Sequence, residues 1–349
     1  MGNRTDSQVV SAHSVPLLVR LSPQWLGYAR PMTLVTVDDV RGAATRIASD
    51  VIRTPLLPCA RLSDELGLRV LIKPESLQNT GSFKVRGALN TLLTWKENGT
   101  LPEGVVGFSA GNHAAAVAFA GQRLGVKAII AMPHDAVESK VINVRRYGGE
   151  IVPTDDLLGT TEELAAQYGY PALLPFNLPE VIAGQGTVGL EIAEDAQDAA
   201  AVIVPVGGGG LISGIGAAVT ALAPSMRVIG VEPEVSNALS LAMTHGEVRE
   251  LPRAARTIAD GLAAPRAGNH TLENALAYVD EMAVVSENAI GEAWADLADS
   301  AKLIVEPAAA VGLAALRSGA VSLPAGSTVV LVVSGGNADL VKLAQARMG

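Results

Sequence analysis

The sequence has a single cysteine, few aromatic residues and no long run of basic residues. With Cys59 alone, no disulfide can form within the chain, which fits a reducing cytoplasm. Aromatic residues make up only 3% of the chain, so alanine, valine, glycine and leucine must fill the core. The 26 basic and 35 acidic residues give a net charge of −9, which argues against nucleic acid or an anionic membrane as the main partner.

No stretch has the pattern of a targeting signal or a membrane span. Residues 1–31 contain two short apolar runs broken by prolines and arginines, and we interpret them as an N-terminal extension before a fresh start at Met32. Residues 199–226 carry no charge and are long enough to cross a bilayer. Pro205 and four consecutive glycines interrupt them, however, so we predict a strand, a loop and a helix instead.

From about residue 70, short apolar runs alternate with glycine-rich turns and alanine-rich amphipathic stretches. This alternation predicts an α/β fold whose largely parallel sheets are covered by helices on both faces. A chain of 349 residues is long enough for two lobes, but no flexible linker separates them, so a second domain must be an insertion. The predicted strands are residues 70–73, 105–108, 128–132, 150–152, 201–206, 228–231 and 328–333.

Lys84 stands at the start of a predicted helix, residues 85–95, directly after Phe83. The N-terminus of a helix is partially positive and disfavours a second cation. The conflict is relieved if the amine loses its proton or forms a Schiff base, and both are ways to make a nucleophilic lysine. A solvated lysine on an exposed helix face is the simpler interpretation of this residue taken alone.

Two glycine-containing segments follow predicted strands, at the sheet edge where ligands of α/β proteins gather. The first contains Ser109, Gly111, Asn112 and His113, and its backbone amides could hold a carboxylate or simply begin a capped helix. The second has four glycines before a helix that begins at Leu211, and its consecutive amides favour a phosphate. It is neither the dinucleotide fingerprint nor a P-loop, which argues against a nucleotide-binding protein.

The remaining candidates are weaker. Ser334 leaves the last predicted strand and could touch a ligand ring or belong to a turn. Glu306 precedes a predicted helix, where a carboxylate is favourable as an N-terminal charge. The histidines show no metal-ligand spacing, so we predict no metal site.

Taken in order, these segments resemble the fold-type II pyridoxal phosphate-dependent enzymes, specifically the group of threonine/serine dehydratases and serine racemases. The resemblance extends from about Met32 to the C-terminus. The matching motifs are Ser82-Phe83-Lys84-Val85-Arg86-Gly87-Ala88, Ser109-Ala110-Gly111-Asn112-His113-Ala114, Val181-Ile182-Ala183-Gly184-Gln185-Gly186-Thr187, Val204-Pro205-Val206-Gly207-Gly208-Gly209-Gly210-Leu211, Thr257-Ile258-Ala259-Asp260-Gly261-Leu262-Ala263, Glu306-Pro307-Ala308 and Ser334-Gly335-Gly336-Asn337.

The resemblance implies a role for each site residue. Lys84 carries the cofactor as a Schiff base and later moves protons at the substrate Cα. The other cofactor contacts are Phe83 on the ring, Asn112 at the 3-hydroxyl, Ser334 at the pyridine nitrogen, and Gly207, Gly208, Gly209, Gly210 and Leu211 at the phosphate. The substrate carboxylate is held by Ser109, Gly111, Asn112 and His113. Because a neutral serine leaves the pyridine nitrogen largely unprotonated, the resemblance favours β-elimination over transamination.

The family fold implies two domains, the smaller inserted in the larger. We expect the large domain at residues 32–103 and 178–349, the small domain at 104–177, and no C-terminal regulatory domain. Two positions depart from the racemase pattern. Ala110 replaces the serine that serves racemases as an acid/base, and Ser240 stands where an aspartate would complete a cation site with Glu232.

We therefore expect an L-threonine/L-serine ammonia-lyase that forms 2-oxobutanoate or pyruvate plus ammonia. The alternatives are serine racemisation, dehydration of another β-hydroxy amino acid such as hydroxyaspartate or phenylserine, and a non-catalytic protein that binds pyridoxal phosphate or an amino acid. The expected partners are a small amino acid substrate and a second copy of the chain, in a dimer or tetramer, with no nucleic acid and no membrane. The expected location is the cytoplasm.

Overall fold

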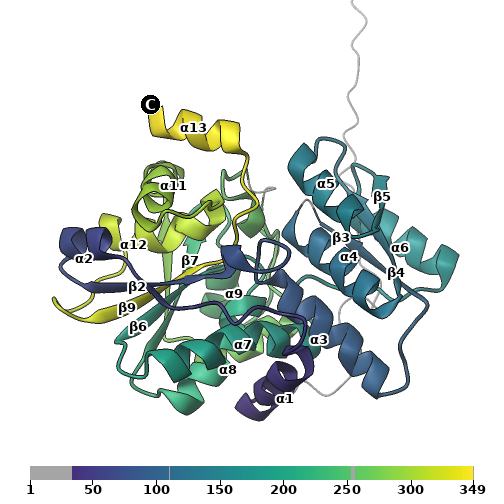
Figure 1. The fold of residues 1–349 in the computed structure, drawn as a ribbon, viewed down its shortest axis with the longest axis horizontal. Helices are drawn as coiled ribbons and strands as arrows, with labels where there is room; N and C mark the ends of the chain where they lie inside the picture. The colour runs from purple at the N-terminus through teal and green to yellow at the C-terminus, as the bar shows by residue number, and fades with distance from the viewer. Residues whose placement is uncertain (1–33, 110, 253–255, 349) are drawn as a thin grey trace, which may run out of the picture. The chain divides into compact units, whose positions relative to one another are not determined.

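The computed structural model describes residues 34–109, 111–252 and 256–348. The expected extension at 1–31 and Ala110 lie outside these residues. Residues 32–349 form one compact unit. It contains two sheets, which Figure 1 shows with their helices: a six-stranded sheet of order β1-β2-β9-β6-β7-β8 and a three-stranded sheet of order β3-β4-β5.

All neighbouring strands pair in parallel, except that β1 is antiparallel to β2. The strands β3 to β5 fall between β2 and β6 along the chain, so the small sheet is inserted into the chain of the large one. This confirms the predicted fold class, while the domain boundaries stay a prediction. The strands are β1 (Leu57–Pro58), β2 (Arg69–Pro74), β3 (Gly104–Phe108), β4 (Lys127–Met132), β5 (Glu150–Pro153), β6 (Ala201–Pro205), β7 (Arg227–Pro233), β8 (Glu281–Val285) and β9 (Thr328–Val333).

Helices cover both faces of the large sheet because successive strand side chains point to opposite faces. Ile203 of β6 packs with the helices of one layer, and its neighbours Val202 and Val204 pack with those of the other. The first layer consists of α2 (Ala60–Leu66), α11 (Glu287–Ala301), α12 (Val311–Ser318) and α13 (Leu340–Met348). The second consists of α7 (Pro179–Asp195), α8 (Gly210–Leu222), α9 (Ala238–His245) and α10 (Asn269–Tyr278).

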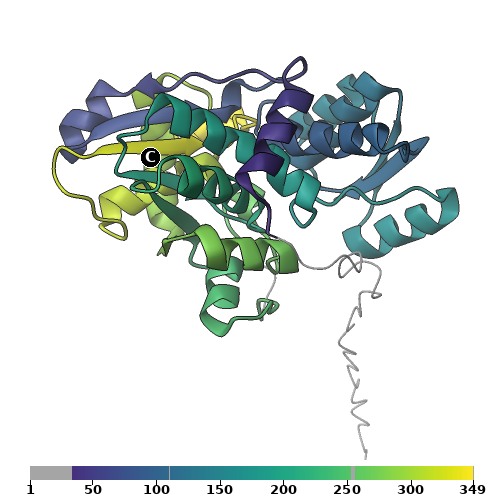
Figure 2. The ribbon, with the colours of Figure 1, turned by 90° about the horizontal axis from the view of Figure 1, so that it is seen from below.

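The small sheet is covered in the same way. Its first face packs on α3 (Lys84–Glu97), α4 (Asn112–Leu124) and α5 (Glu138–Arg146), and its second on α6 (Leu157–Tyr168). The helix α1 (Val37–Ile47) lies beside α7 and α3 (Figure 2). The described residues also include the 3₁₀ turns η2 (Glu75–Leu77), η3 (Asp260–Leu262) and η4 (Pro307–Ala310).

The structure differs from the expected elements at the periphery. The short strand β1 and the edge strand β8 were not predicted, and β8 has only Ala283 and Val285 buried. The uncharged run 199–226 folds as β6, a glycine loop and α8, as predicted. In the part of the chain that the structure describes, no helix has both the length and the apolar composition of a membrane span.

Candidate active site

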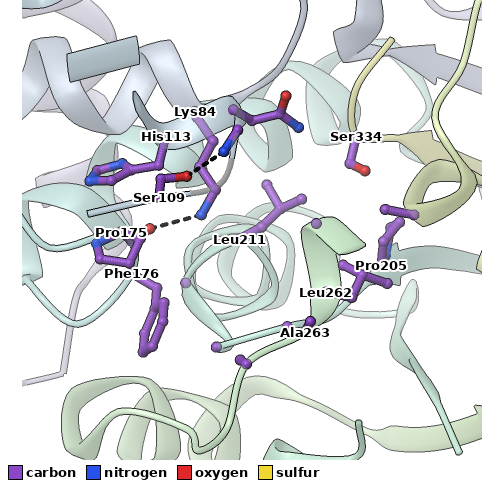
Figure 3. A pocket seen from close by; sticks show the side chains of 18 of the residues that line it. Lys84, Ser109, His113, Pro175, Phe176, Pro205, Leu211, Leu262, Ala263 and Ser334 are labelled. Atoms are coloured by element: carbon purple, nitrogen blue, oxygen red, sulfur yellow. Dashed lines mark hydrogen bonds between the residues drawn. The ribbon is translucent and has the colours of Figure 1, made fainter. Parts of the chain in front are cut away.

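A cavity of about 330 Å³ lies at the carboxyl ends of β3, β6 and β9, beside the start of α3. Every residue to which the sequence analysis gave a cofactor or carboxylate role lines this cavity. Figure 3 labels five of them: Lys84, Ser109, His113, Leu211 and Ser334. Sheet edges therefore bring together segments that are more than 200 residues apart, since parallel strands all end on the same side.

Lys84 is the first residue of α3, as predicted, and its side chain is half-buried. Its Nζ donates to the carbonyl oxygen of Pro175 at 2.9 Å and lies 5.2 Å from the centroid of the Phe83 ring. Burial lowers the pKa of the Lys84 amine to about 8, and the Glu306 carboxyl acts in the opposite direction. An appreciable fraction of the amine is therefore unprotonated near neutral pH, which is the nucleophilic form.

The glycine loop, Gly207–Gly210, runs from β6 into α8. Gly209 has a φ of +93°, a region that side chains other than glycine rarely adopt. A Cβ on Gly208 would lie 2.3 Å from the ring of Phe176, so only glycine lets the chain pass this close. Thr271 holds the loop from the other side, because its Oγ1 donates to the Gly208 carbonyl at 2.8 Å. The loop thus places consecutive backbone amides at a helix N-terminus, which suits a phosphate.

Ser109 follows β3, Gly111 precedes α4, and Asn112 and His113 are the first two residues of that helix. The Gly111 amide donates to the Ser109 hydroxyl at 2.9 Å. The Asn112 side chain is held at both ends, since its Nδ2 donates to Glu306 Oε1 at 2.7 Å and its Oδ1 accepts from Asn337 Nδ2 at 2.8 Å. These bonds fix the orientation of the Asn112 amide at the cavity wall.

His113 and Ser334 enter the cavity wall as uncharged groups. The Nε2 of His113 lies 2.8 Å from the Leu173 carbonyl oxygen. Burial lowers the pKa of the His113 imidazole to about 3, and Lys84 acts in the same direction, so the ring is neutral and its Nε2 donates to that carbonyl. Ser334 is buried at the end of β9, across the cavity from Lys84 (Figure 3), and its carbonyl accepts from the Phe83 amide at 3.2 Å.

Glu306 lies directly before a helical turn, as the sequence analysis stated, but its side chain has a further environment. It precedes η4 but makes no side-chain capping bond, and its carboxyl group lies in the cavity wall instead. Glu306 is 2% exposed, and its Oε2 has no hydrogen-bond partner among the described residues. Burial raises the pKa of this carboxyl to about 7, and the Lys140 ammonium opposes the rise.

Lys140 and Asp260 form an ion pair in the cavity wall, which the sequence analysis did not predict. Lys140 belongs to α5 and is buried, whereas Asp260 belongs to η3 and is half-exposed. Asp260 stood inside a matching motif without an assigned role, and Lys140 gave no signal at all. Their side chains meet only because α5 and η3 face each other across the cavity.

The doubtful cation position at Glu232 is occupied by protein donors. The Glu232 carboxyl accepts from the Leu239 amide at 2.9 Å, and from both the amide and the hydroxyl of Ser240. In the described residues, no three side chains of histidine, cysteine, aspartate or glutamate gather closely enough to hold a metal ion.

The cavity thus offers a partly neutral amine, a glycine loop whose backbone amides suit an anion, and a helix start that suits a carboxylate. This set suits a phosphorylated aldehyde together with an amino acid.

Comparison with known proteins gives a consistent result. Residues 47–335 match the family described as pyridoxal-phosphate dependent enzyme. The chain is 40% identical to an L-threonine ammonia-lyase of Thermotoga maritima over 88% of this chain and 77% of the relative. It is 36% identical to an L-threo-3-hydroxyaspartate ammonia-lyase of Saccharomyces cerevisiae over 90% and 96%. The solved structure of maize serine racemase superposes with a TM-score of 0.84 at 36% identity, covering 90% of this chain and 98% of that one.

Proposed function

Since this chain belongs to the family of pyridoxal-phosphate-dependent enzymes, we propose that it is an L-threonine/L-serine ammonia-lyase. Its products would be 2-oxobutanoate or pyruvate, plus ammonia. The observation that carries the proposal is the Lys84 amine, which has a pKa of about 8 and lies in one cavity with the glycine loop Gly207–Gly210 and the start of α4. A threonine ammonia-lyase among the relatives supports the choice of substrate.

The residues of the cavity fit pyridoxal phosphate. Lys84 would hold its aldehyde carbon, the glycine loop its phosphate, and Phe83 its ring. Asn112 would contact the 3-hydroxyl, and Ser334 would face the pyridine nitrogen as a neutral partner. When bound, the cofactor supplies an electron sink for the Cα of the amino acid.

The protein's own groups would then orient the substrate and move its protons. The amides at the start of α4 hold the α-carboxylate, and this fixes the Cα beside Lys84. The neutral Lys84 amine accepts the Cα proton. The Lys84 ammonium formed in this way returns the proton to the β-hydroxyl, which leaves as water while a double bond forms between Cα and Cβ. Hydrolysis of the resulting unsaturated amine consumes one water and gives the 2-oxo acid and ammonia.

The test is the product balance of the holoenzyme. L-threonine should release ammonia and 2-oxobutanoate in equal amounts, and L-serine should do the same with pyruvate. Chiral chromatography of the L-serine reaction should show little D-serine. Absence of ammonia from both substrates would overturn the proposal and favour a non-catalytic binding protein.

The second candidate is racemisation, or dehydration of another β-hydroxy amino acid. The relatives support this candidate, because their identities to this chain are similar. A serine racemase is 38% identical and a hydroxyaspartate ammonia-lyase 36%, compared with 40% for the threonine ammonia-lyase. D-serine that accumulates as fast as pyruvate would support racemisation. The homo-oligomer and the cytoplasmic location remain part of this proposal.

A further inference from the structure

The Lys140–Asp260 ion pair lies beside the expected position of the substrate. The Lys140 side chain packs directly against Gly111, just before α4: a Cβ on Gly111 would be 2.9 Å from Lys140 Cδ and 3.1 Å from its Nζ. From there Lys140 reaches Asp260 on η3. The pair therefore joins the loop that would hold the α-carboxylate to a separate segment of the cavity wall.

The charges in the cavity wall limit which substrates can bind. Among the residues that line the described cavity, Lys84 and Lys140 are the two amines. Lys84 is committed to the reaction centre, so Lys140 is the group that could hold a second negative charge on the substrate. Asp260 neutralises it, and Glu306, whose pKa burial raises to about 7, is only partly charged near neutral pH.

On the basis of the proposed function, we propose that Asp260 restricts the substrate class to β-hydroxy amino acids with an uncharged side chain. Asp260 already forms an ion pair with the Lys140 ammonium, and a carboxylate on the side chain of the substrate would need that ammonium as its partner. A dicarboxylic substrate would have to break this ion pair and would also face the negative charge of Asp260. Threonine and serine leave the pair intact.

The test variant is Asp260→Asn, which keeps the shape of the side chain and frees Lys140. The ratio of kcat/KM for L-threo-3-hydroxyaspartate to that for L-threonine should rise by at least about tenfold. An unchanged or lower ratio would overturn the inference. An equal rise for both substrates would also overturn it, because Lys140 would then serve the α-carboxylate that both share.

Two controls isolate the charge on Lys140. The double variant Asp260→Asn/Lys140→Met should lose the gain, since no amine remains to hold a second carboxylate. The variant Glu150→Gln breaks the exposed Lys127–Glu150 pair away from the cavity and should leave the ratio at the wild-type value. A gain in the double variant as large as in Asp260→Asn would show that Lys140 is not the group responsible.

A binding measurement separates this inference from the proposed function. Succinate and butanoate have the same number of carbon atoms but two carboxylates and one, respectively. Calorimetric titration of the holoenzyme should show that Asp260→Asn tightens binding of succinate and not of butanoate. If the wild-type enzyme releases no ammonia from any of the amino acids, the proposed function fails while this titration still tests the role of Asp260. Equal affinity changes for the two acids would reject that role.

Discussion

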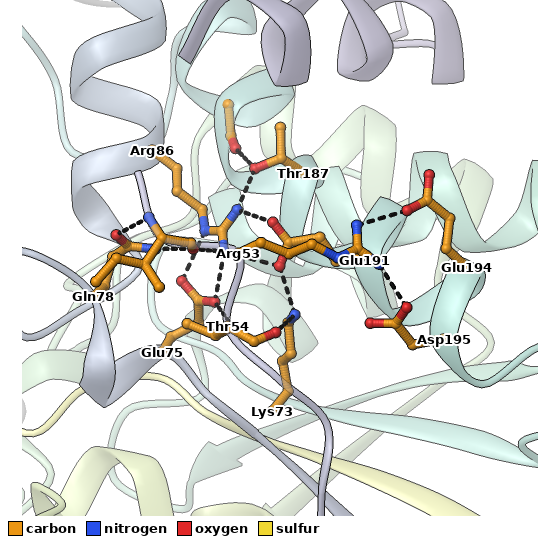
Figure 4. A network of polar contacts seen from close by, with 12 residues as sticks. Arg53, Thr54, Lys73, Glu75, Gln78, Arg86, Thr187, Glu191, Glu194 and Asp195 are labelled. Carbon is orange, nitrogen blue, oxygen red and sulfur yellow. Dashed lines mark hydrogen bonds and ion pairs between the residues drawn. The ribbon is translucent and has the colours of Figure 1, made fainter. Parts of the chain in front are cut away.

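Two clusters of charged side chains meet at the start of α3 and behave in opposite ways. One is the cavity cluster of Lys84, Lys140, Asp260 and Glu306, which all line the cavity; Figure 3 labels Lys84 of this set. The other is the Arg86 network, in which Arg86, Glu75, Glu191 and Lys73 are joined by hydrogen bonds and ion pairs (Figure 4). Lys84 and Arg86 are separated by one residue of α3, so their environments and not their sequence position make the difference.

In the Arg86 network every charge has a partner of opposite sign. Arg86 is fully buried and donates to Glu75 at 2.8 Å and to Glu191 at 2.6 Å, while Lys73 Nζ lies 2.5 Å from Glu191. Although burial alone would lower it, the two carboxylates raise the pKa of Arg86 above its ordinary value. Burial alone would raise the pKa of the Glu75 carboxyl, but the neighbouring Arg86 lowers it below its ordinary value. Arg86 and Glu75 are thus held in their charged forms, whereas burial lowers the pKa of the Lys73 ammonium despite its carboxylate partners. The network joins β2, η2, α3 and α7.

In the cavity, burial is only partly compensated by partners. The pKa values of Lys84 and Glu306 therefore move toward neutrality, to about 8 and about 7. Groups of this kind can exchange protons near physiological pH, and they cluster at functional sites. The comparison teaches that incomplete pairing distinguishes the reactive cluster from the structural one.

Lys84→Ala should give the largest effect on activity. It removes both the group that would hold the cofactor and the base at Cα, so ammonia release should fall by at least about 10⁴-fold. Reduction with borohydride followed by mass spectrometry should no longer attach the cofactor to the chain. Lys96→Ala, at the exposed end of the same helix, is the matched control and should retain activity. A cofactor adduct on another lysine of the wild-type protein would contradict the assignment.

Arg86→Met should give the largest effect on stability. It leaves Glu75 and Glu191 buried without their cation, and breaking such a pair destabilises a protein by about 3–5 kcal/mol. Urea denaturation would measure the loss. Arg53→Met removes an exposed arginine paired with Glu194 and Asp195 and should change the free energy of unfolding by less than about 1 kcal/mol. Equal losses in the two variants would refute the structural role of the Arg86 network.

The sequence predicted the parts of the site whose residue types carry their own chemistry. A lysine at a helix start and four glycines after a strand each suggest a chemical role from the local sequence alone. Lys84 and Gly207–Gly210 were therefore predicted as site residues, and they line the cavity. Glu306 and Lys140 were not, because each acquires its environment from a distant segment. The bond between Asn112 and Glu306 spans 194 positions, and that between Lys140 and Asp260 spans 120. A carboxylate before proline looks the same whether it caps a helix or faces a cavity.

The fold shows the same limit. Buried strands such as β6 and β9 were predicted because packing on both faces makes them continuously apolar. The edge strand β8 has a mixed pattern that does not distinguish it from a loop. Helix α1 was also missed, although its capping box of Thr36 and Asp39 was visible in the sequence.

Glu306→Gln should alter the dependence of stability on pH. The folded-state pKa of about 7 lies above the ordinary value of 4.5, so the folded protein binds the proton more tightly than the unfolded chain. The stability from this group is full below pH 4.5 and is lost as the pH rises through about 7. Glutamine stays neutral, so the variant should gain on the wild type between pH 5 and pH 8, by up to about 3 kcal/mol.

Urea denaturation at the two pH values measures this gain as a difference between variant and wild type, which cancels the titration of all other groups. Glu292→Gln, at an exposed site on α11, provides the control for the loss of one surface carboxylate. A constant difference between Glu306→Gln and wild type across the range would mean that Glu306 does not carry a raised pKa. The cavity cluster would then resemble the Arg86 network more closely than we infer.

Gly208→Asp should give the smallest effect and adds an unpaired charge to the cavity. Its Cβ would lie 2.3 Å from the Phe176 ring, and its carboxylate would repel the phosphate that the glycine loop is expected to hold. Affinity for pyridoxal phosphate, measured by equilibrium dialysis, should fall by at least about tenfold, or ~1.4 kcal/mol. Gly208→Ala introduces the collision without the charge, so its smaller loss separates the two causes.

Gly42→Asp on α1 is the control, because no atom lies within 4 Å of a Cβ built there. It should leave the affinity for pyridoxal phosphate at the wild-type value. An affinity of Gly208→Asp equal to that of wild type would place the phosphate elsewhere. Equal losses in the alanine and aspartate variants would show that the narrow passage under Phe176, and not the anion site, is what the loop must preserve. Only a larger loss of affinity in Gly208→Asp than in Gly208→Ala supports a loop that binds the negatively charged phosphate.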